Sequence, residues 1–251
     1  MARNSRPAGN FSAAQRRTRA RDCGFSLIEM LISMAVFLLL TGMVFEQIIA
    51  MQRKATTESA KVDTTEQARE FVDQMMRDIH MAGFPKAAMY ATPLDNTSPL
   101  VAAGLVSVSP TQMILEGDVN SEGQVYSVNV QYVAADANDP NCPCVRRSAV
   151  PKTAASPLAQ PTSPVYTETE HLIAPGPGPG QAGEDLFAYY DQNGNKIDVT
   201  GGVDISTPGG QATIQSIKTI KVNVSLANDR PADGPGETTR MSLTGTARLK
   251  Q

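Results

Sequence analysis

The chain has 251 residues, a formal charge of −3, no tryptophan and only two histidines. The first 24 residues hold six of the 22 basic residues and one of the 25 acidic ones, so the rest carries 16 basic and 24 acidic residues, a formal charge of −8. This acidic balance argues against binding of nucleic acid through its phosphates, and no RNA-binding motif accompanies the N-terminal arginines.

A long apolar segment follows the basic N-terminus. No residue between Met30 and Phe45 is charged, and residues 25–50 contain only Glu29 and Glu46 as charged residues. This length is sufficient to span a bilayer, which needs about 20 apolar residues. The preceding arginines predict a cytoplasmic N-terminus and an exported C-terminal part. A charge at the centre of such a helix costs roughly 2.5 to 3.5 kcal/mol, so Glu29 is expected to have a partner or a function.

The junction between the two segments reads Gly24-Phe25-Ser26-Leu27-Ile28-Glu29. It resembles the processing site of type IV prepilins and type II secretion pseudopilins, whose peptidase cuts after the glycine and methylates the new N-terminus. The resemblance implies that residues 1–24 are a leader ending at Gly24, that Phe25 is the N-methylated mature terminus, and that Glu29 pairs with the terminal amine of a neighbouring subunit. From the residues alone, the alternative is a plain signal-anchor helix whose glutamate faces other helices.

The helix is predicted to continue beyond the apolar segment. Apolar residues recur at steps of three and four over residues 62–82, which is the spacing of an amphipathic helix, and Gly83 and a following proline end it. We therefore predict one helix over residues 25–83, with residues 25–50 as its transmembrane and filament-core part.

Residues 84–251 are predicted to form an exported, β-rich domain. Short alternating or β-branched runs are broken there by Gly, Pro, Asn and Asp, a pattern typical of a mainly antiparallel sheet. Proline- and glycine-rich stretches near 149–164 and 174–183 are predicted to be loops. The predicted strands are 104–109, 112–116, 125–134, 145–150, 165–173, 185–190, 214–226 and 240–249. The predicted fold class is α+β, a long N-terminal helix packed on an antiparallel sheet domain.

Asn193-Gly194 is a signal for a two-residue hairpin turn. Together with Asp191, Asn195 and Asp198, Asn193 also offers oxygens to a calcium ion. The glycine at the sixth position and the glutamate at the twelfth position of a calcium-binding loop are missing, so a hairpin tip is the commoner meaning of this run.

Cys142 and Cys144 are the two cysteines of the predicted exported domain. An oxidising compartment favours a bond between two such cysteines, although their separation by one residue predicts strain. We favour a disulfide within the loop over free thiols or an intermolecular link. The spacing is not the CxxC of a thioredoxin-like enzyme, and no second pair is present to complete a zinc site.

The sequence contains no motif that indicates catalysis. A nucleophile elbow, a phosphate-binding loop and a metal-spaced histidine pair are all missing, and His80 and His171 are far apart in the sequence. We expect neither enzymatic activity nor a cofactor.

Two further segments, 76–84 and 189–194, are similar to PilW-type minor pilins, and the first is also similar to J-type minor pseudopilins. This resemblance implies a minor pilin that helps to prime or cap a type IV pilus in motility, adhesion or DNA uptake. The implied partners are other minor and major pilins, the prepilin peptidase, the inner-membrane assembly platform, and membrane lipid before assembly. The implied location is the inner membrane, with a periplasmic C-terminal domain, and then the filament. The alternatives are a minor pseudopilin of a type II secretion system and a signal-anchored periplasmic binding module.

Overall fold

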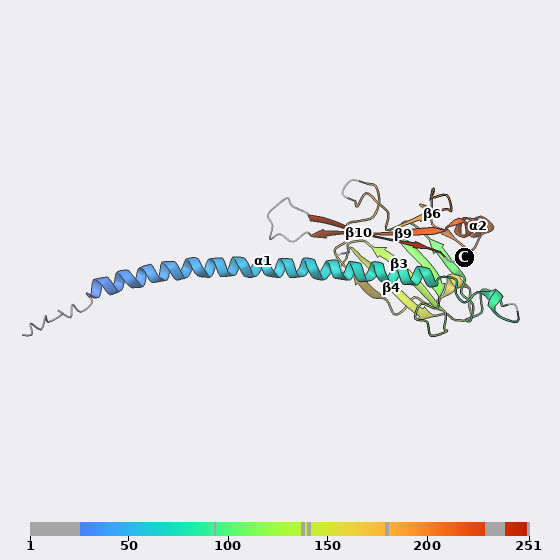
Figure 1. Ribbon diagram of the computed structural model, residues 1–251, viewed down its shortest axis with the longest axis horizontal. Helices are drawn as coiled ribbons and strands as arrows, with labels where there is room; N and C mark the ends of the chain where they lie inside the picture. Colours follow the sequence, from blue (N-terminus) through green and yellow to red (C-terminus); the bar gives the residue numbers. More distant parts are fainter. Residues whose placement is uncertain are drawn as a thin grey trace, which may run out of the picture. The chain divides into compact units, whose positions relative to one another are not determined.

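The computed structural model describes residues 26–92, 94–136, 139, 142–178, 181–228 and 239–249. The chain divides after Gln52 into two compact units, residues 1–52 and 53–251. The predicted α+β class is confirmed, because one long helix, α1 (Leu27–Met81), precedes a domain of antiparallel strands (Figure 1).

Helix α1 begins where the carbonyl of Ser26 accepts the backbone N–H groups of Glu29 and Met30, at 2.9 and 3.1 Å. It ends at Met81, and Gly83 then adopts a φ of +80°, a left-handed conformation that glycine adopts without steric cost. The helix therefore ends two residues before the predicted limit of 83. Its predicted first residue, 25, lies outside the described residues.

Sheet A has six antiparallel strands in the order β5-β4-β3-β2-β1-β8. Four of its strands lie within one residue of the predicted limits at each end. The fifth, predicted over 165–173, ends early, because His171 has a φ of +57°, which an extended strand does not allow. The strands are β1 (Gly104–Val108), β2 (Gln112–Gly117), β3 (Tyr126–Val133), β4 (Cys144–Pro151), β5 (Tyr166–Thr169) and β8 (Val203–Asp204).

Sheet C has four antiparallel strands in the order β10-β9-β6-β7. They are β6 (Phe187–Tyr190), β7 (Lys196–Ile197), β9 (Thr219–Asn228) and β10 (Thr239–Arg248). The predicted hairpin joins β6 to β7, but its turn is longer than two residues. The backbone N–H of Asp191 donates to the carbonyl of Asn195, so the strands end before Asp191 and resume at Lys196.

The predicted strand over 214–226 is wrong in its first part. Residues Pro208–Ser216 form a second helix, α2, and β9 begins only at Thr219. The side chain of Thr207 accepts the N–H of Gly210, and Pro208 occupies the first turn, so two helix-starting signals outweigh the β-branched residues that follow. Two short 3₁₀ helices, η1 (Ala87–Met89) and η2 (Pro157–Ala159), lie in loops.

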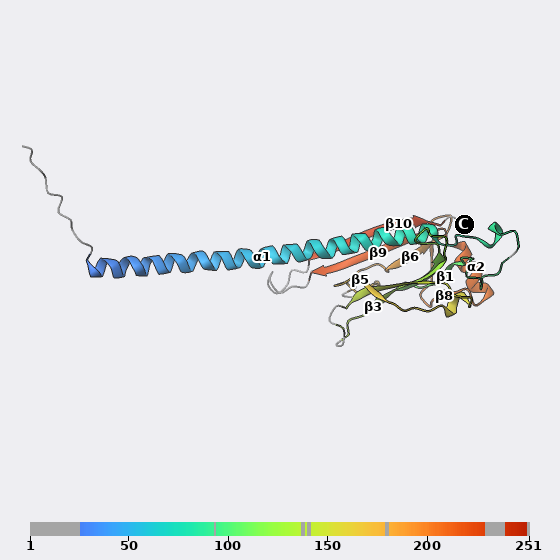
Figure 2. The same ribbon diagram turned by 90° about the horizontal axis from the view of Figure 1, so that it is seen from below.

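The second half of α1 supplies one wall of the core in residues 53–251 (Figure 2). Its buried side chains meet apolar residues from both sheets, and they are Ala68, Phe71, Val72, Met75 and Ile79. The predicted stripe starts too early, because Val62 is 59% exposed and Thr65 is only half-buried. Burial begins at Ala68, after the point where Thr65 contacts Met241 of β10.

Two buried ion pairs fix the connections around this core. Arg147 of β4 donates to Oδ2 of Asp78 on α1 through Nε at 3.0 Å and Nη2 at 2.8 Å. Lys152 Nζ donates to Oε2 of Glu116 at 2.6 Å, and both side chains are fully buried. The same ammonium donates to the carbonyls of Asn96 and Val101, so it holds the chain between α1 and β1 against sheet A.

Candidate assembly site in the N-terminal segment

The first part of α1 exposes an almost continuous apolar surface. Large apolar side chains from Leu27 to Met51 are exposed, and none of the most apolar 18-residue window is buried. Among the residues that the structure describes, α1 is the one helix long and apolar enough to cross a membrane, by length and composition. An exposed patch of this extent indicates contact with lipid or with other apolar helices.

Glu29 lies in the first turn of α1, and its side chain is exposed. The N-terminal end of a helix carries a partial positive charge, which stabilises a carboxylate at this position. An exposed carboxylate beside an apolar surface is suited to accept charge-assisted hydrogen bonds from an ammonium group of another chain. Gly24 and Phe25, the predicted processing residues, lie outside the described residues.

Two hydroxyl side chains within the apolar segment are satisfied by the helix itself. The hydroxyl of Ser33 donates to the carbonyl of Met30 at 3.0 Å, and the hydroxyl of Thr41 donates to the carbonyl of Phe37 at 2.7 Å. Both hydroxyls therefore need no partner from water. Glu29 and Glu46 are then the charged groups of this segment that a surrounding apolar phase must accommodate.

Cys142 and Cys144 are joined by a disulfide, with their Cα atoms 4.3 Å apart. Both residues are buried, and Cys144 begins β4 opposite Val133 of β3. The disulfide closes a short loop at the start of β4.

The residues considered for calcium lie in two separate turns. Oδ1 of Asp191 accepts the N–H groups of Asn193 and Asn195 at 2.8 and 2.9 Å, and Oδ2 accepts the side-chain amide of Asn195 at 3.0 Å. Asp198 instead accepts the N–H and the hydroxyl of Thr200. These hydrogen bonds lower the pKa of both carboxyls. Among the described residues, no group of three or more His, Cys, Asp or Glu side chains is placed to hold a metal ion.

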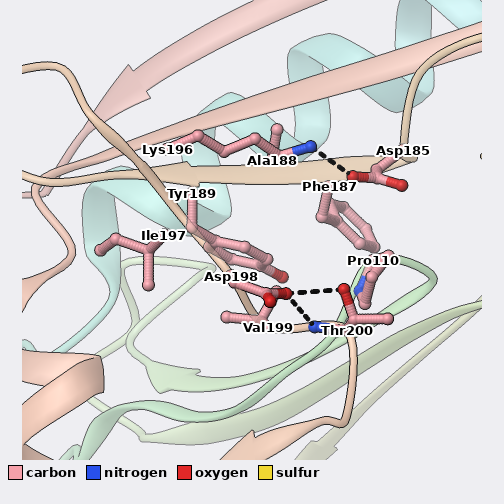
Figure 3. Close-up of a pocket in the computed structure, with 10 residues that line it drawn as sticks. All are labelled: Pro110, Asp185, Phe187, Ala188, Tyr189, Lys196, Ile197, Asp198, Val199 and Thr200. Atoms are coloured by element: carbon pink, nitrogen blue, oxygen red, sulfur yellow. Dashed lines mark hydrogen bonds and ion pairs between the residues drawn. The ribbon is translucent and has the colours of Figure 1, made fainter.

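A cavity of about 300 Å³ lies behind this hairpin (Figure 3). Its polar groups are engaged with neighbours: Lys196 pairs with Asp185 at 2.7 Å, and the hydroxyl of Tyr189 donates to the carbonyl of Ser109 at 3.2 Å. Burial raises the pKa of Tyr189 well above its usual value, so this hydroxyl stays neutral. These contacts support the hairpin.

The two buried ion pairs were not predicted from the sequence. Asp78 lies 69 positions before Arg147, and Glu116 lies 36 positions before Lys152. A charged residue inside an otherwise apolar helical face, as at Asp78, is the one pattern that indicates a buried partner.

The prokaryotic N-terminal methylation motif matches residues 19–45. This range contains Gly24, Phe25, Glu29 and most of the exposed apolar surface of α1. Searches of curated proteins and of solved structures each gave no significant match. The motif and the apolar helix that begins within it support a type IV pilin-like or pseudopilin protein, with membrane anchoring, processing by a prepilin peptidase and assembly with other pilins in general.

Proposed function

We propose that the chain is a minor pilin of a type IV pilus, a structural subunit that helps to prime or cap the filament. The observation that carries this proposal is the methylation motif at residues 19–45 on an apolar helix that continues into the core of a β-rich domain. Such a chain is anchored by one end of its helix and displays the domain attached to the other end.

Two interactions drive assembly: packing between apolar helices and an ion pair. The apolar side chains of α1 leave lipid for the helices of neighbouring subunits, where packing and van der Waals contacts stabilise them. Glu29 then pairs with the N-terminal amine of a neighbour. Two opposite charges 4 Å apart attract by about 4 kcal/mol at an effective dielectric of 20, before desolvation is subtracted. The pair favours one axial register between subunits.

The minor, low-copy role rests on the similarity of residues 76–84 and 189–194 to PilW-type chains. This role brings other minor and major pilins and the inner-membrane assembly platform as partners. The proposed role is structural and not enzymatic. The location is the inner membrane with a periplasmic domain, and then the filament.

The second candidate is a minor pseudopilin of a type II secretion system. The same methylation motif favours it, because pilins and pseudopilins share this processing site, and residues 76–84 are similar to J-type chains as well. A clean deletion of the gene separates the two. Lost surface pili with normal secretion would support the pilus subunit, whereas normal pili with secreted enzymes trapped in the periplasm would support the pseudopilin.

A substitution at Glu29 tests the assembly mechanism and separates it from a plain signal anchor. We expect Glu29→Ala to be cleaved after Gly24 as usual, while its content in sheared filaments falls by about tenfold, equivalent to about 1.4 kcal/mol. Glu46→Ala is the matched control, because Glu46 is the other charged residue of the segment, and its variant should enter filaments normally. Equal filament content in both variants would contradict the register role. Intact mass should show loss of residues 1–24 and one added methyl group, and an uncleaved chain would support the plain anchor.

A further inference from the structure

A second cavity adjoins the one behind the β6–β7 hairpin. It has a volume of about 480 Å³, and the two cavities meet at Asp185 and Lys196, which line both of them (Figure 3). This volume falls within the range of about 300 to 1,000 Å³ that is typical of sites for small ligands. We call the second cavity the outer hollow, and among the side chains that line it are Pro110, Glu184, Asp185, Tyr190, Lys196 and Lys221.

Strand alternation places the floor of the outer hollow on the face of sheet C opposite to the core. Phe187 and Tyr189 of β6 belong to the buried core, so Ala188 and Tyr190 face the other side. Lys221 of β9 is paired with Ala188 and lies on that same face. Tyr190 is only partly buried, so part of its side chain is accessible to a molecule in the hollow.

The charged side chains of the outer hollow pair with one another. Lys196 Nζ donates to Oδ2 of Asp185 at 2.7 Å, and Lys221 Nζ donates to the two carboxylate oxygens of Glu184 at 3.1 and 3.3 Å. Among the described residues that line the hollow, these two cations and two anions are the charged ones, and their formal charges sum to zero. A charged ligand would meet a side chain of its own sign next to each partner, so the lining favours an uncharged ligand.

Both ion pairs leave hydrogen-bonding capacity for such a ligand. An ammonium group carries three N–H donors and a carboxylate offers about four acceptor sites, and each pair uses only part of this capacity. The side chains of Lys196 and Glu184 are 56% and 53% exposed, so their remaining positions can be reached from the hollow. A ligand with several hydroxyl groups can accept from the ammonium groups and donate to the carboxylates without breaking either pair.

Apolar rings line the same hollow. The pyrrolidine rings of Pro110, Pro175 and Pro177 lie on its wall, together with the side chain of Tyr190. The face of an aromatic ring carries a partial negative charge, which attracts the weakly positive C–H groups of a ring laid flat on it. A sugar ring has C–H groups on its faces and hydroxyl groups around its rim. It therefore matches both the apolar and the hydrogen-bonding groups of the hollow.

We propose that the outer hollow binds one uncharged sugar unit of a glycan. The sugar ring lies on Tyr190, and its hydroxyl groups bond to the Lys196–Asp185 and Lys221–Glu184 pairs. The site belongs to residues 53–251, so it is separate from the contact made by Glu29. Contact with a glycan outside the cell rests on the proposed function, because that function exports the domain.

The methyl glycosides of glucose, galactose, mannose, N-acetylglucosamine and N-acetylgalactosamine are the probes for this site. The full-length chain is purified in a detergent without a sugar head group. Binding is followed by saturation-transfer difference NMR at up to about 10 mM sugar, which detects dissociation constants in the millimolar range. We expect saturation transfer from the protein to the ring C–H protons of at least one of these sugars.

Substitutions at Tyr190 test the stacking contact. Tyr190→Phe keeps the aromatic ring and should bind the sugar within about threefold of the wild type, whereas Tyr190→Ala should weaken binding by about tenfold or more. Tyr166→Ala is the matched control, because Tyr166 is an exposed tyrosine on β5 of the other sheet, and this variant should bind normally.

A charge series gives a second test that keeps the Tyr190 ring. The wild type should bind the neutral sugar more tightly than its uronic acid or its amino sugar. Glu184→Ala removes an anion from an exposed position, so the hollow becomes positive, and binding of the uronic acid relative to the neutral sugar should rise by about tenfold. If Tyr190→Ala does not fold, this series decides the question.

Four results would overturn the proposal: no saturation transfer to any of the five sugars, equal binding by Tyr190→Ala and Tyr166→Ala, tighter binding of a charged sugar by the wild type, or an unchanged preference in Glu184→Ala. Filament content of each variant is scored in parallel. A chain that enters filaments but binds no sugar contradicts only the sugar site, whereas a chain that binds sugar but never enters filaments contradicts only the proposed function.

Discussion

Replacing Arg147 by methionine should strongly destabilise the domain. Arg147 is the cationic partner of Asp78, whose side chain is completely buried on α1. Gln74 donates to the other carboxylate oxygen of Asp78 at 2.7 Å, so Arg147→Met leaves a buried carboxylate with one amide partner. Removing one member of a buried ion pair typically costs about 3 to 5 kcal/mol. We expect the free energy of unfolding to fall by about that amount.

The pH dependence of this loss follows from the pKa of Asp78. Burial raises the pKa of this carboxyl above its usual value, and Arg147 opposes the rise. Because the pKa is raised on folding, the group's contribution to stability is present below the unfolded pKa of about 3.9 and is lost as the pH rises through the folded pKa. Arg147→Met raises the folded pKa further. The difference in unfolding free energy between the wild type and the variant should therefore be largest near neutral pH and shrink as the pH approaches about 4.

The assay is urea unfolding of the full-length chain in detergent, followed by near-ultraviolet circular dichroism of its six tyrosines, because it has no tryptophan. Arg69→Met is the matched control, because the pair Arg69–Glu66 is more than half exposed and such pairs contribute about 0.3 to 0.5 kcal/mol. The double variant Asp78→Leu with Arg147→Met should recover most of the loss. A loss below about 1 kcal/mol for Arg147→Met, or one equal to that of Arg69→Met, would refute this reasoning.

Three further predictions concern the same domain. Gly117→Ala should lower the free energy of unfolding by about 1 to 3 kcal/mol, because its Cβ would collide with the backbone carbonyl of Met81, whereas Gly201→Ala, in open space, should change it by less than about 0.5 kcal/mol in the same urea titration. Phe71→Ala should cost about 3 to 5 kcal/mol through the cavity it leaves in the core, and an effect below about 1 kcal/mol would contradict the placement of this side chain. The pKa of Asp191 is lowered by the amides of its hairpin, so its contribution to stability is present above the unfolded pKa of about 3.9 and is lost as the pH falls through the folded pKa. Thermal unfolding should accordingly show Asp191→Asn below the wild type at neutral pH, with the gap closing at acidic pH.

Much of the fold could be predicted from periodicity because local patterns determine local structure. Apolar steps of three and four gave the second half of α1, and alternation gave most strands of sheet A to within one residue. The failures came from special backbone positions and from caps. His171 stops β5 with its positive φ, and the Thr207–Pro208 cap starts α2 where β-branched residues suggested a strand. The longer β6–β7 turn depends on hydrogen bonds that the side chain of Asp191 accepts from the backbone N–H groups of Asn193 and Asn195, and periodicity does not reveal them.

The sequence by itself determined the N-terminal segment, since Gly24, Phe25, Glu29 and the apolar run lie close together in the sequence and their chemistry depends on their order along the chain. Only the tertiary structure decided the pairings between distant residues, such as Asp78 with Arg147 and Lys152 with Glu116. It also decided that β10 lies at the edge of sheet C. The physical reason is that strand order and buried charge pairs are set by how the elements pack together, whereas a helix start, a charge and an apolar length are already properties of the linear chain.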